Sequence, residues 1–535
     1  MLTLNEVQQK PENNPKLEEF IQKFQLAFQN QNLQELIRSL KIIRAILSEE
    51  QTDNEIFENM VKKIGESDII QQISHYIKPQ FKNEVALQKE SMQIFSILLA
   101  TNQEIYMKKM LDQQIVPLFF NQFESDEIEI REFAIYCVAN IVGDNKEYKK
   151  QMIQQGLIEK ITETLVKKDQ NKQLLENLAF LLNNILDQSD GLTLNYKKVE
   201  PLIPLLQSLI QQNIEDNNSV AFDLFSALSG LTENRSKKSL EKFIQQYNGI
   251  ILKTIQYLKK MRNKGFHEGV MVQAFYFLEN ITYADDEDLM QVVQLGLHEL
   301  AYQYTTIFKD SIKEVNMRII KNLCKMQSEN NQILYDHHTI ILEIIRCAEE
   351  EKFNVKRQAI QALASLYNQA DQKQADLLVK DFDTLEIMAN ALNYNDADIL
   401  EEVLNGLEML FYEGEDKKEQ QGLNINYYSM IFEKRYNGFS KIDKIIMEHQ
   451  QEEIVKIATE IYGNYYQVDF QDLELQDEKD EFFNEGFDEY TEINGVPFKD
   501  LPQEEQQSII SKIQKQKDVK QVQKATMNQQ QQQLF

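Results

Sequence analysis

The sequence predicts an all-α solenoid, that is, a stack of helical repeats, and three observations support this prediction. Apolar residues recur at helical spacing along most of the chain. Only 16 of the 535 residues are glycine and 8 are proline, while 42% are apolar, which favours long helices with brief interruptions and an ample core. One helical pattern also returns at a nearly constant step, and each unit of such a stack contacts only its neighbours.

The clearest repeat lies between residues 131 and 186. In its first helix, FAIYCVANIV, apolar residues at helical spacing predict one buried face. Tyr136 and Asn140 are four residues apart and share a different face of this helix. The pair Gly143 and Asp144 is expected to end the helix.

The same design returns in LAFLLNNIL, where Phe180 and Asn184 stand at the places of Tyr136 and Asn140. Positions equivalent to Asn140 recur at intervals of about 40–50 residues along the chain, as expected for armadillo or HEAT repeats. The equivalent positions are Ile97, Asn140, Asn184, Gly230, Asn280, Asn322, Ser365 and Met409.

Along the chain, the sequence predicts four segments. Residues 1–30 form a polar N-terminal segment, either a fraying end or a first short helix, and residues 31–466 form the repeat solenoid. Residues 467–500 are an acidic linker, because 469–492 hold eleven acidic residues against one lysine. Residues 501–535 are a Gln-rich tail that is expected to be mostly disordered.

Charge and cysteine content restrict the function further. The net charge is −28 and the pI is about 4.8, which disfavours nucleic acid and favours cationic partners, although a solvated acidic surface alone also explains it. Cys137, Cys324 and Cys347 are scattered in apolar contexts, so we expect buried thiols in a reducing compartment. The start has no signal-peptide pattern and no apolar run is long enough to span a membrane, so we expect a soluble chain without membrane partners.

No pattern of catalysis is present, so we expect no enzymatic activity, no cofactor and no metal. The sequence has no glycine-rich phosphate loop, no GxSxG and no HExxH. Adjacent residues of a helix point about 100° apart, so the neighbouring His337 and His338 are poorly placed to share a metal.

The informative residues lie on the helices that carry Asn140 and its equivalents, because these helices line the concave groove of a right-handed armadillo stack. Asparagine has a donor and an acceptor, so a ladder of asparagines can clamp a peptide backbone. Tyr136 and Phe180 are expected to flank the aliphatic stem of a lysine, and Asp144, at an exposed helix end, to take its ammonium group. The ladder residues are Asn140, Asn184, Asn280 and Asn322. The alternative is that each asparagine is only a polar helix end and that Phe180 belongs to the core.

At these residues the sequence resembles the importin-α (karyopherin-α) family, in which Trp-x-x-x-Asn precedes Gly-Asp. The resemblance is carried by FAIYCVANIVGDNKEYKKQMIQQG, by ENITYADDEDLMQVVQLG and by the last repeat before the acidic block. It implies a right-handed armadillo-repeat superhelical solenoid of about ten repeats. It also implies an adaptor that carries proteins with basic nuclear localisation signals between cytoplasm and nucleus, and that meets an export receptor through the last repeat and the acidic block.

Carried over position by position, the family's main signal-binding site falls on a small set of residues, with Asp144 as the acid that pairs with the key lysine. The set is Tyr136, Asn140, Asp144, Phe180 and Asn184, with Thr101 nearby, and it begins at Gln93 and Ile97, which do not match the family residues. The second site of the family falls on Arg318, Asn322, Gln361 and Ser365. There an arginine replaces a tryptophan and would repel a basic ligand, so we expect this second site to be lost.

Two departures from the family leave a second hypothesis open. The chain contains no tryptophan, and its first residues lack the arginine-rich segment with which the family binds importin-β, so importin-β is not expected as a partner. The first hypothesis is an adaptor for basic peptides, supported by Asn140, Asp144, Asn184 and the acidic block. The second is a structural armadillo scaffold, cytoskeletal or ciliary, that no longer transports cargo.

Overall fold

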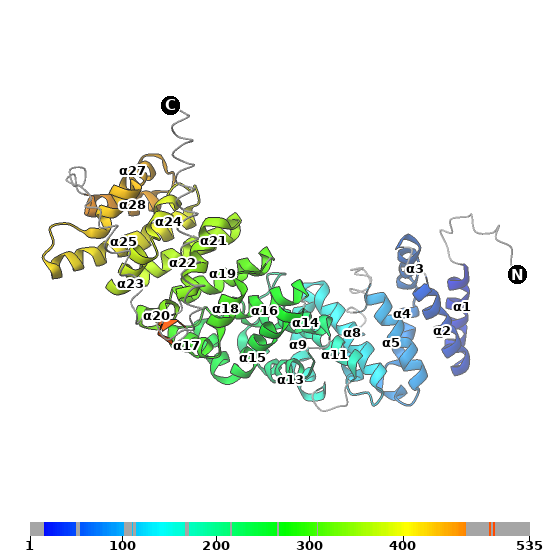
Figure 1. The fold of residues 1–535 in the computed structure, drawn as a ribbon. Helices are drawn as coiled ribbons and strands as arrows, with labels where there is room; N and C mark the ends of the chain where they lie inside the picture. Colours follow the sequence, from blue (N-terminus) through cyan, green and yellow to red (C-terminus); the bar gives the residue numbers. More distant parts are fainter. Residues whose placement is uncertain are drawn as a thin grey trace. The chain divides into compact units, whose positions relative to one another are not determined.

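Helices make up almost all of the described chain, which confirms the predicted all-α class (Figure 1). The computed structural model describes residues 15–49, 54–100, 110, 114–165, 171–213, 217–264, 267–307, 309–336, 338–466, 492–493 and 496–497. The chain divides into two compact units, Met1–Leu297 (unit 1) and His298–Phe535 (unit 2), where the sequence analysis treated the solenoid as one stack.

Unit 1 begins with the helix that the sequence left open, since α1 packs on α2 and buries Leu17 and Phe24. The helices of unit 1 are α1 Pro15–Gln29, α2 Leu33–Glu49, α3 Asn54–Glu66, α4 Ile69–Tyr76, η2 Pro79–Phe81, α5 Val85–Leu99, α7 Val116–Gln122, α8 Ile128–Asp144, α9 Lys146–Gln154, α10 Leu157–Lys160, η3 Ile161–Leu165, α11 Lys172–Leu186, α12 Tyr196–Val199, η4 Glu200–Leu202, α13 Ile203–Asn213, α14 Asn218–Thr232, α15 Lys237–Lys264, α16 Glu268–Ile281 and α17 Asp286–Gln294.

Helix α18, Leu297–Tyr304, begins at the boundary and lies almost wholly in unit 2. The other helices of unit 2 are α19 Asp310–Cys324, α20 Ser328–Asp336, α21 His338–Glu350, α22 Phe353–Gln369, α23 Gln372–Asp376, η5 Leu377–Asp381, α24 Leu385–Ala391, α25 Ala397–Gln421, α26 Tyr427–Tyr436, α27 Gly438–Glu448 and α28 Glu452–Tyr465. In the described part, the only strands are β1 Glu492–Ile493 and β2 Val496–Pro497, which pair antiparallel.

A repeat consists of three helices, as in α9, α10 with η3, and α11. Helix α8 ends at Asp144 as predicted, and the side chain of Asn145 caps α9 by accepting a 2.7 Å hydrogen bond from Glu147 N. Gly156 separates α9 from α10 with φ of 89°, a left-handed conformation that favours glycine. Asn171 caps α11 by accepting from Leu174 N. Three helices per repeat of this length are typical of armadillo rather than HEAT repeats.

The helices that carry the positions equivalent to Asn140 contact one another in series within each unit, beginning with α5, which carries Ile97. We call those from α8 onward the ladder helices. They are α8, α11, α14 and α16 in unit 1 and α19, α22 and α25 in unit 2. Glycine allows close backbone contact between them, because a Cβ added at Gly230 would lie 2.3 Å from Leu186 O, and one at Gly406 would lie 2.8 Å from Ala364 O. The ladder helices therefore form a continuous row within each unit.

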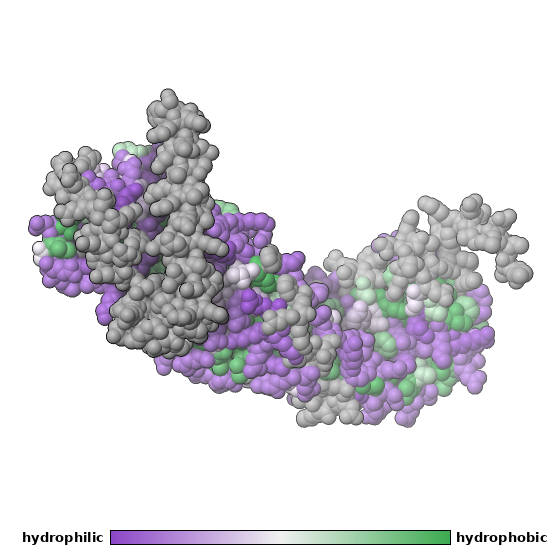
Figure 2. Space-filling view, viewed as in Figure 1, coloured by the Kyte–Doolittle hydropathy of each residue, from purple (hydrophilic) through white to green (hydrophobic). Residues whose placement is uncertain are grey.

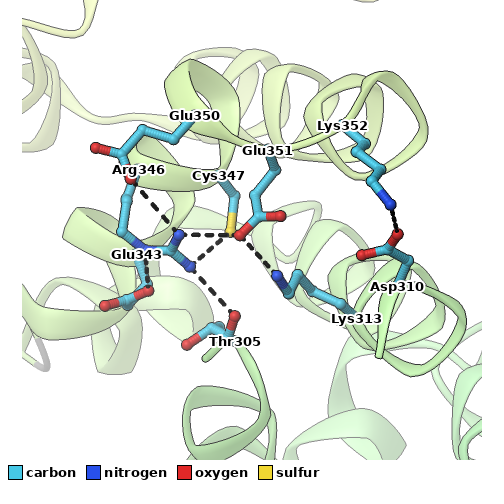
Figure 3. A network of polar contacts seen from close by, with 9 residues as sticks. All are labelled: Thr305, Asp310, Lys313, Glu343, Arg346, Cys347, Glu350, Glu351 and Lys352. Carbon is cyan, nitrogen blue, oxygen red and sulfur yellow. Dashed lines mark hydrogen bonds and ion pairs between the residues drawn. The ribbon is translucent and has the colours of Figure 1, made fainter. Parts of the chain in front are cut away.

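The three cysteines are buried and free, as the sequence predicted. Burial raises the pKa of the Cys347 thiol to about 12, so this side chain stays neutral at physiological pH. Beside it, Arg346 donates to Glu343 Oε2 at 2.9 Å, to Glu351 Oε1 at 3.0 Å and to Thr305 O at 3.2 Å, and so ties α21 to the end of α18 (Figure 3). This network is a packing feature of unit 2.

The remaining predictions concern surface and tails. On the face drawn in Figure 2, hydrophilic residues cover most of the described surface and hydrophobic residues gather in small patches. Within the ranges that the structure describes, no helix is long and apolar enough to cross a membrane. Thr101, His337 and nearly all of the acidic linker and Gln-rich tail lie outside the described residues.

Candidate functional site

The aromatic pair predicted for the ladder lies on adjacent helices of unit 1. Tyr136 of α8 and Phe180 of α11 are both half-buried, so Phe180 is not a core residue. Their ring centroids are 6.2 Å apart and the ring planes are inclined at 32°. The pair thus forms one partly exposed aromatic surface across two repeats.

This aromatic surface differs from the expected slot for a lysine stem. Carbon atoms in contact lie about 3.5–4.0 Å apart, so a methylene chain between two rings requires a ring separation of about 7–8 Å. At 6.2 Å, the rings of Tyr136 and Phe180 contact each other and leave no room between them. A lysine stem can pack over the two rings but not between them, which reduces the area it buries.

The ladder asparagines of unit 1 join neighbouring repeats. Asn184 Nδ2 donates to Ala139 O at 2.9 Å, and Asn280 Nδ2 donates to Ser229 O at 3.0 Å. Each acceptor lies one residue before the ladder position of the preceding helix, so the predicted register holds for both pairs. Asn140 Nδ2 instead donates to Tyr136 O of its own helix at 2.9 Å.

The Asn184 amide is held in place by a glycine. A Cβ added at Gly143 would lie 2.6 Å from Asn184 Nδ2, so only glycine leaves space for this amide on α8. Among the described residues, no hydrogen bond to the amide oxygen of Asn184 is formed, which leaves an acceptor for a peptide N–H.

Asp144 is the last residue of α8 and is half-buried rather than exposed as expected. The C-terminal end of a helix carries a partial negative charge, so a carboxylate there is disfavoured by about 0.3–1 kcal/mol unless a cation is nearby. A cation bound at this end would interact both with the carboxylate and with the helix dipole.

Charge is distributed unevenly along the ladder helices of unit 1. Their cations are Arg131 of α8, which is 3% exposed, and Lys172, the first residue of α11, while α14 and α16 contain no lysine or arginine. The acids of these helices are Glu129, Glu132, Asp144, Glu176, Asp223, Glu268 and Glu279. The row is therefore acidic, aromatic and amide-rich, which suits a cationic ligand.

Asp223 is a residue of this row that sequence reasoning missed. It lies half-buried on α14 and accepts a 3.0 Å hydrogen bond from Asn183 Nδ2 of α11. Burial raises the pKa of the Asp223 carboxyl to about 6, although the bond from Asn183 acts in the opposite direction. The signal in the sequence was a single acid within the apolar helix AFDLFSALSGL, in the part of the chain where the repeat pattern is weakest.

In unit 2 the ladder positions of α19 and α22 are buried, whereas Met409 of α25 is 37% exposed. Asn322 is only 7% exposed, so its side chain is not accessible to a ligand as the ladder prediction requires. Gln361 is 5% exposed. Lys321 Nζ donates to Gln361 Oε1 at 3.3 Å, and Lys325 of the α19 end pairs with Glu402 of α25 at 2.8 Å. Since α22 lies between α19 and α25 in the row, this ion pair bridges α22. The loss of the second site stays a prediction.

The described residues of the chain include no group of three His, Cys, Asp or Glu side chains that could hold a metal ion. His338 lies against Phe382, with ring centroids 5.7 Å apart, and burial lowers the pKa of its imidazole. This environment is that of a packed neutral side chain.

Two curated relatives share low sequence identity with the chain. Importin subunit alpha-8 of Arabidopsis thaliana is 21% identical over 360 residues, which cover 67% of this chain and 77% of that protein. Importin subunit alpha-1b of Oryza sativa subsp. japonica is 22% identical over 366 residues, which cover 67% of this chain but less than two thirds (64%) of that protein. No family model matches the chain.

Among solved structures, an engineered protein, Northeast Structural Genomics Consortium target OR497, is similar with a TM-score of 0.65 and 15% identity, covering 85% of this chain and all of that one. A designed armadillo repeat protein gives a TM-score of 0.40 at 16% identity over 47% of this chain and 99% of its own. The three-helix repeats described above make the fold an all-α armadillo solenoid. The sequence similarity to the two importin subunits supports a divergent importin-α/armadillo family.

Proposed function

We propose that unit 1 binds a basic peptide segment of a cargo protein on its ladder helices, as an importin-α-like adaptor for protein import into the nucleus. The observation that carries this proposal is the charge pattern of α8, α11, α14 and α16. After Lys172 no further cation occurs on these helices, while acids, aromatic rings and amides recur along the row. A lysine-rich or arginine-rich peptide complements such a surface in charge.

Each group in the row has a role in this proposal. The amide oxygen of Asn184 accepts from a backbone N–H of the extended peptide, while its NH2 group keeps the bond to Ala139 O. The rings of Tyr136 and Phe180 support a lysine stem, and Asp144 at the end of α8 pairs with the ammonium group. Because the rings leave no slot, the affinity is expected to be modest.

The same proposal extends to partners and location. A transport adaptor works in both cytoplasm and nucleus, and an export receptor would contact the last repeat, α26 to α28, together with the acidic segment that follows it. The relatives named importin subunits support cargo proteins as partners.

The proposal is tested by titrating a fluorescent lysine-rich peptide and measuring anisotropy at low and physiological salt. Loss of one partner of a desolvated charge pair costs about 2–5 kcal/mol, so Asp144→Lys is expected to weaken binding at least about 30-fold. Tyr136→Trp combined with Phe180→Trp adds aromatic area and should tighten binding. Circular dichroism checks that each variant keeps its helices.

A matched control is Tyr302→Ala, which removes a 40% exposed aromatic ring of α18 that is not on a ladder helix. It should leave binding unchanged, whereas Tyr136→Ala should weaken it. The proposal fails if wild type does not bind and the tryptophan pair does not restore binding, or if Asp144→Lys binds as well as wild type.

The second candidate is a structural scaffold without transport activity. The closed contact between Tyr136 and Phe180 favours it, since this contact lacks the slot expected for a lysine stem. Failure of the peptide titration would leave this candidate in place.

A further inference from the structure

We infer that the second half of α15 is a docking surface for an acidic segment of a partner protein. This surface, which we call the basic face, consists of Leu252, Lys253, Gln256, Lys259 and Lys260. Because α15 is not a ladder helix, the inference does not rest on the proposed binding of a basic peptide. The evidence is the charge of α15, the helices packed against it, and the exposed apolar side chain among the lysines.

Cations are concentrated on α15. Lysine and arginine make up 57 of the 535 residues of the chain, yet α15 holds eight of them and a single acid, the exposed Glu241. The helix is kinked at Tyr247, and from Asn248 to Lys264 it has five cations and no acid. In a chain with a net charge of −28, such a run is not the general character of the surface.

The lysines and the leucine share one side of the helix. Lys253 and Lys260 are seven residues apart, and so are Leu252 and Lys259, which places each pair two helical turns apart. Gln256 is exposed and lies between them at helical spacing. The three lysines are half-buried, so their aliphatic stems pack along the helix while the ammonium groups stay at the surface. Leu252 is 37% exposed in the midst of these cations.

The helices packed against α15 add little negative charge to its second half. Helix α15 contacts α13, α16 and α17, and α13 has no charged residue (Figure 1). The acids at the start of α17 lie beside the first half of α15, because Asp285 pairs with Lys237 at 2.5 Å and Asp288 Oδ1 accepts from Gln245 Nε2 at 3.3 Å. The acids of α16 are Glu268 and Glu279. Within the described part of these helices, the second half of α15 therefore keeps an excess of positive charge.

Contacts within the chain do not exclude a ligand. Lys253, Lys259 and Lys260 each interact with other groups of the chain. Ion pairs between partly exposed side chains are worth about 0–1 kcal/mol, so they can be exchanged for pairs with a ligand. A segment with several acids meets several lysines at once, and after the first contact each further one forms within the complex.

The basic face indicates the chemistry of its partner. Acidic side chains complement the lysines, and an apolar side chain among them covers Leu252. The net charge of −28 repels long polyanions such as nucleic acid, whereas a short segment is affected mainly by charges within a Debye length of about 8 Å. The chain's own acidic segment already has a role in the proposed contact with an export receptor, so the acids here come from a partner protein.

The test titrates the full chain with a fluorescent peptide of aspartate and glutamate that carries one leucine at its centre. A second peptide has amides in place of the acids. We expect the acidic peptide to bind at least about tenfold more tightly than the amide peptide and to lose affinity as salt is raised. Lys253→Glu combined with Lys260→Glu should weaken binding of the acidic peptide about tenfold, because attraction becomes repulsion at two positions. Circular dichroism checks that the variant keeps its helices.

A matched control is Lys444→Glu combined with Lys456→Glu, which makes the same change in net charge on exposed lysines of α27 and α28. This variant should bind the acidic peptide like wild type. Leu252→Ala should weaken binding about threefold, and only for a peptide that carries the leucine rather than a serine, as a double-mutant cycle detects.

Other occupants are separated by two further measurements. A full-length variant with amides in place of the acids of 469–492 should bind the acidic peptide much as wild type does. Binding at least about tenfold tighter would show that the chain's own acidic segment covers the basic face, and would overturn the inference. Tighter binding of a single-stranded oligonucleotide or of phosphatidylserine vesicles than of the acidic peptide would overturn it as well.

The inference and the proposed function fail in different experiments. If the acidic and amide peptides bind alike, or if Lys253→Glu with Lys260→Glu binds the acidic peptide as well as wild type, the inference is wrong and the proposed function stands. If the lysine-rich peptide does not bind, the proposed function fails and the inference stands. The double variant should bind the lysine-rich peptide like wild type, because α15 lies outside the ladder row.

Discussion

The charge of Asp223 should destabilise the protein at neutral pH, so Asp223→Asn should stabilise it. Burial raises the pKa of this carboxyl from 3.8 to about 6, a difference of about two units. At 1.36 kcal/mol per unit this amounts to at most about 3 kcal/mol, and the partial exposure of the side chain reduces it to about 1–2 kcal/mol. The variant keeps the acceptor for Asn183, so the bond between α11 and α14 is retained.

The sign follows from proton binding. The folded chain holds a proton on Asp223 more strongly than the unfolded chain, whose carboxyl has a pKa near 3.8. The penalty is therefore fully present above the folded pKa of about 6 and disappears as the pH falls towards 3.8. Urea and thermal unfolding of wild type and Asp223→Asn at pH 7.5 and pH 4 measure this difference, with Glu241→Gln as the control. Equal gains at both pH values, or a loss of stability at pH 7.5, would refute the reasoning.

Three further substitutions test the packing. Gly143→Ala brings a Cβ within 2.6 Å of Asn184 Nδ2, so it should cost about 1–3 kcal/mol and weaken peptide binding; wild-type behaviour in unfolding and titration would contradict this. Glu402→Gln removes a partly exposed ion pair with Lys325, so unfolding should change by less than about 1 kcal/mol. Arg346→Lys keeps the charge but loses the guanidinium bonds of Figure 3, and thermal unfolding should show a loss of about 2–4 kcal/mol.

The sequence predicts what depends on local pattern. The helical class, the repeat step and the end of α8 at Asp144 follow from apolar spacing and from the Gly-Asp pair, which act within one helix. The bond from Asn184 to Ala139 was not predictable, because it depends on how closely two helices approach at Gly143. The closed contact between aromatic rings has the same origin, since ring separation is set by packing between repeats.

Contacts between residues that are remote in sequence also explain two features of the structure that the sequence pattern does not show. Helix α15, Lys237–Lys264, is kinked at Tyr247, whose φ of −129° and ψ of 27° are not helical, so two helical segments meet at this residue. Helix α22 is buried at every position from 358 to 367, although its sequence carries polar residues. Burial of this kind depends on side chains that reach over from α19 and α25, and these contacts are remote in sequence.

The two units differ in what their ladder helices offer, and this difference gives the proposed site its selectivity. In a stack, each repeat contacts only its neighbours, so substitutions at the ladder positions of one unit need not disturb the ladder positions of the other. In unit 2, Arg318 pairs with Glu314 at 3.0 Å and Lys321 donates to Gln358 Oε1 at 2.8 Å, so cations of the chain itself occupy the row. In unit 1 the corresponding places on α14 and α16 hold no cation. A basic ligand would therefore meet cations of the chain on α19, whereas α14 and α16 offer acids without a cation, which favours unit 1.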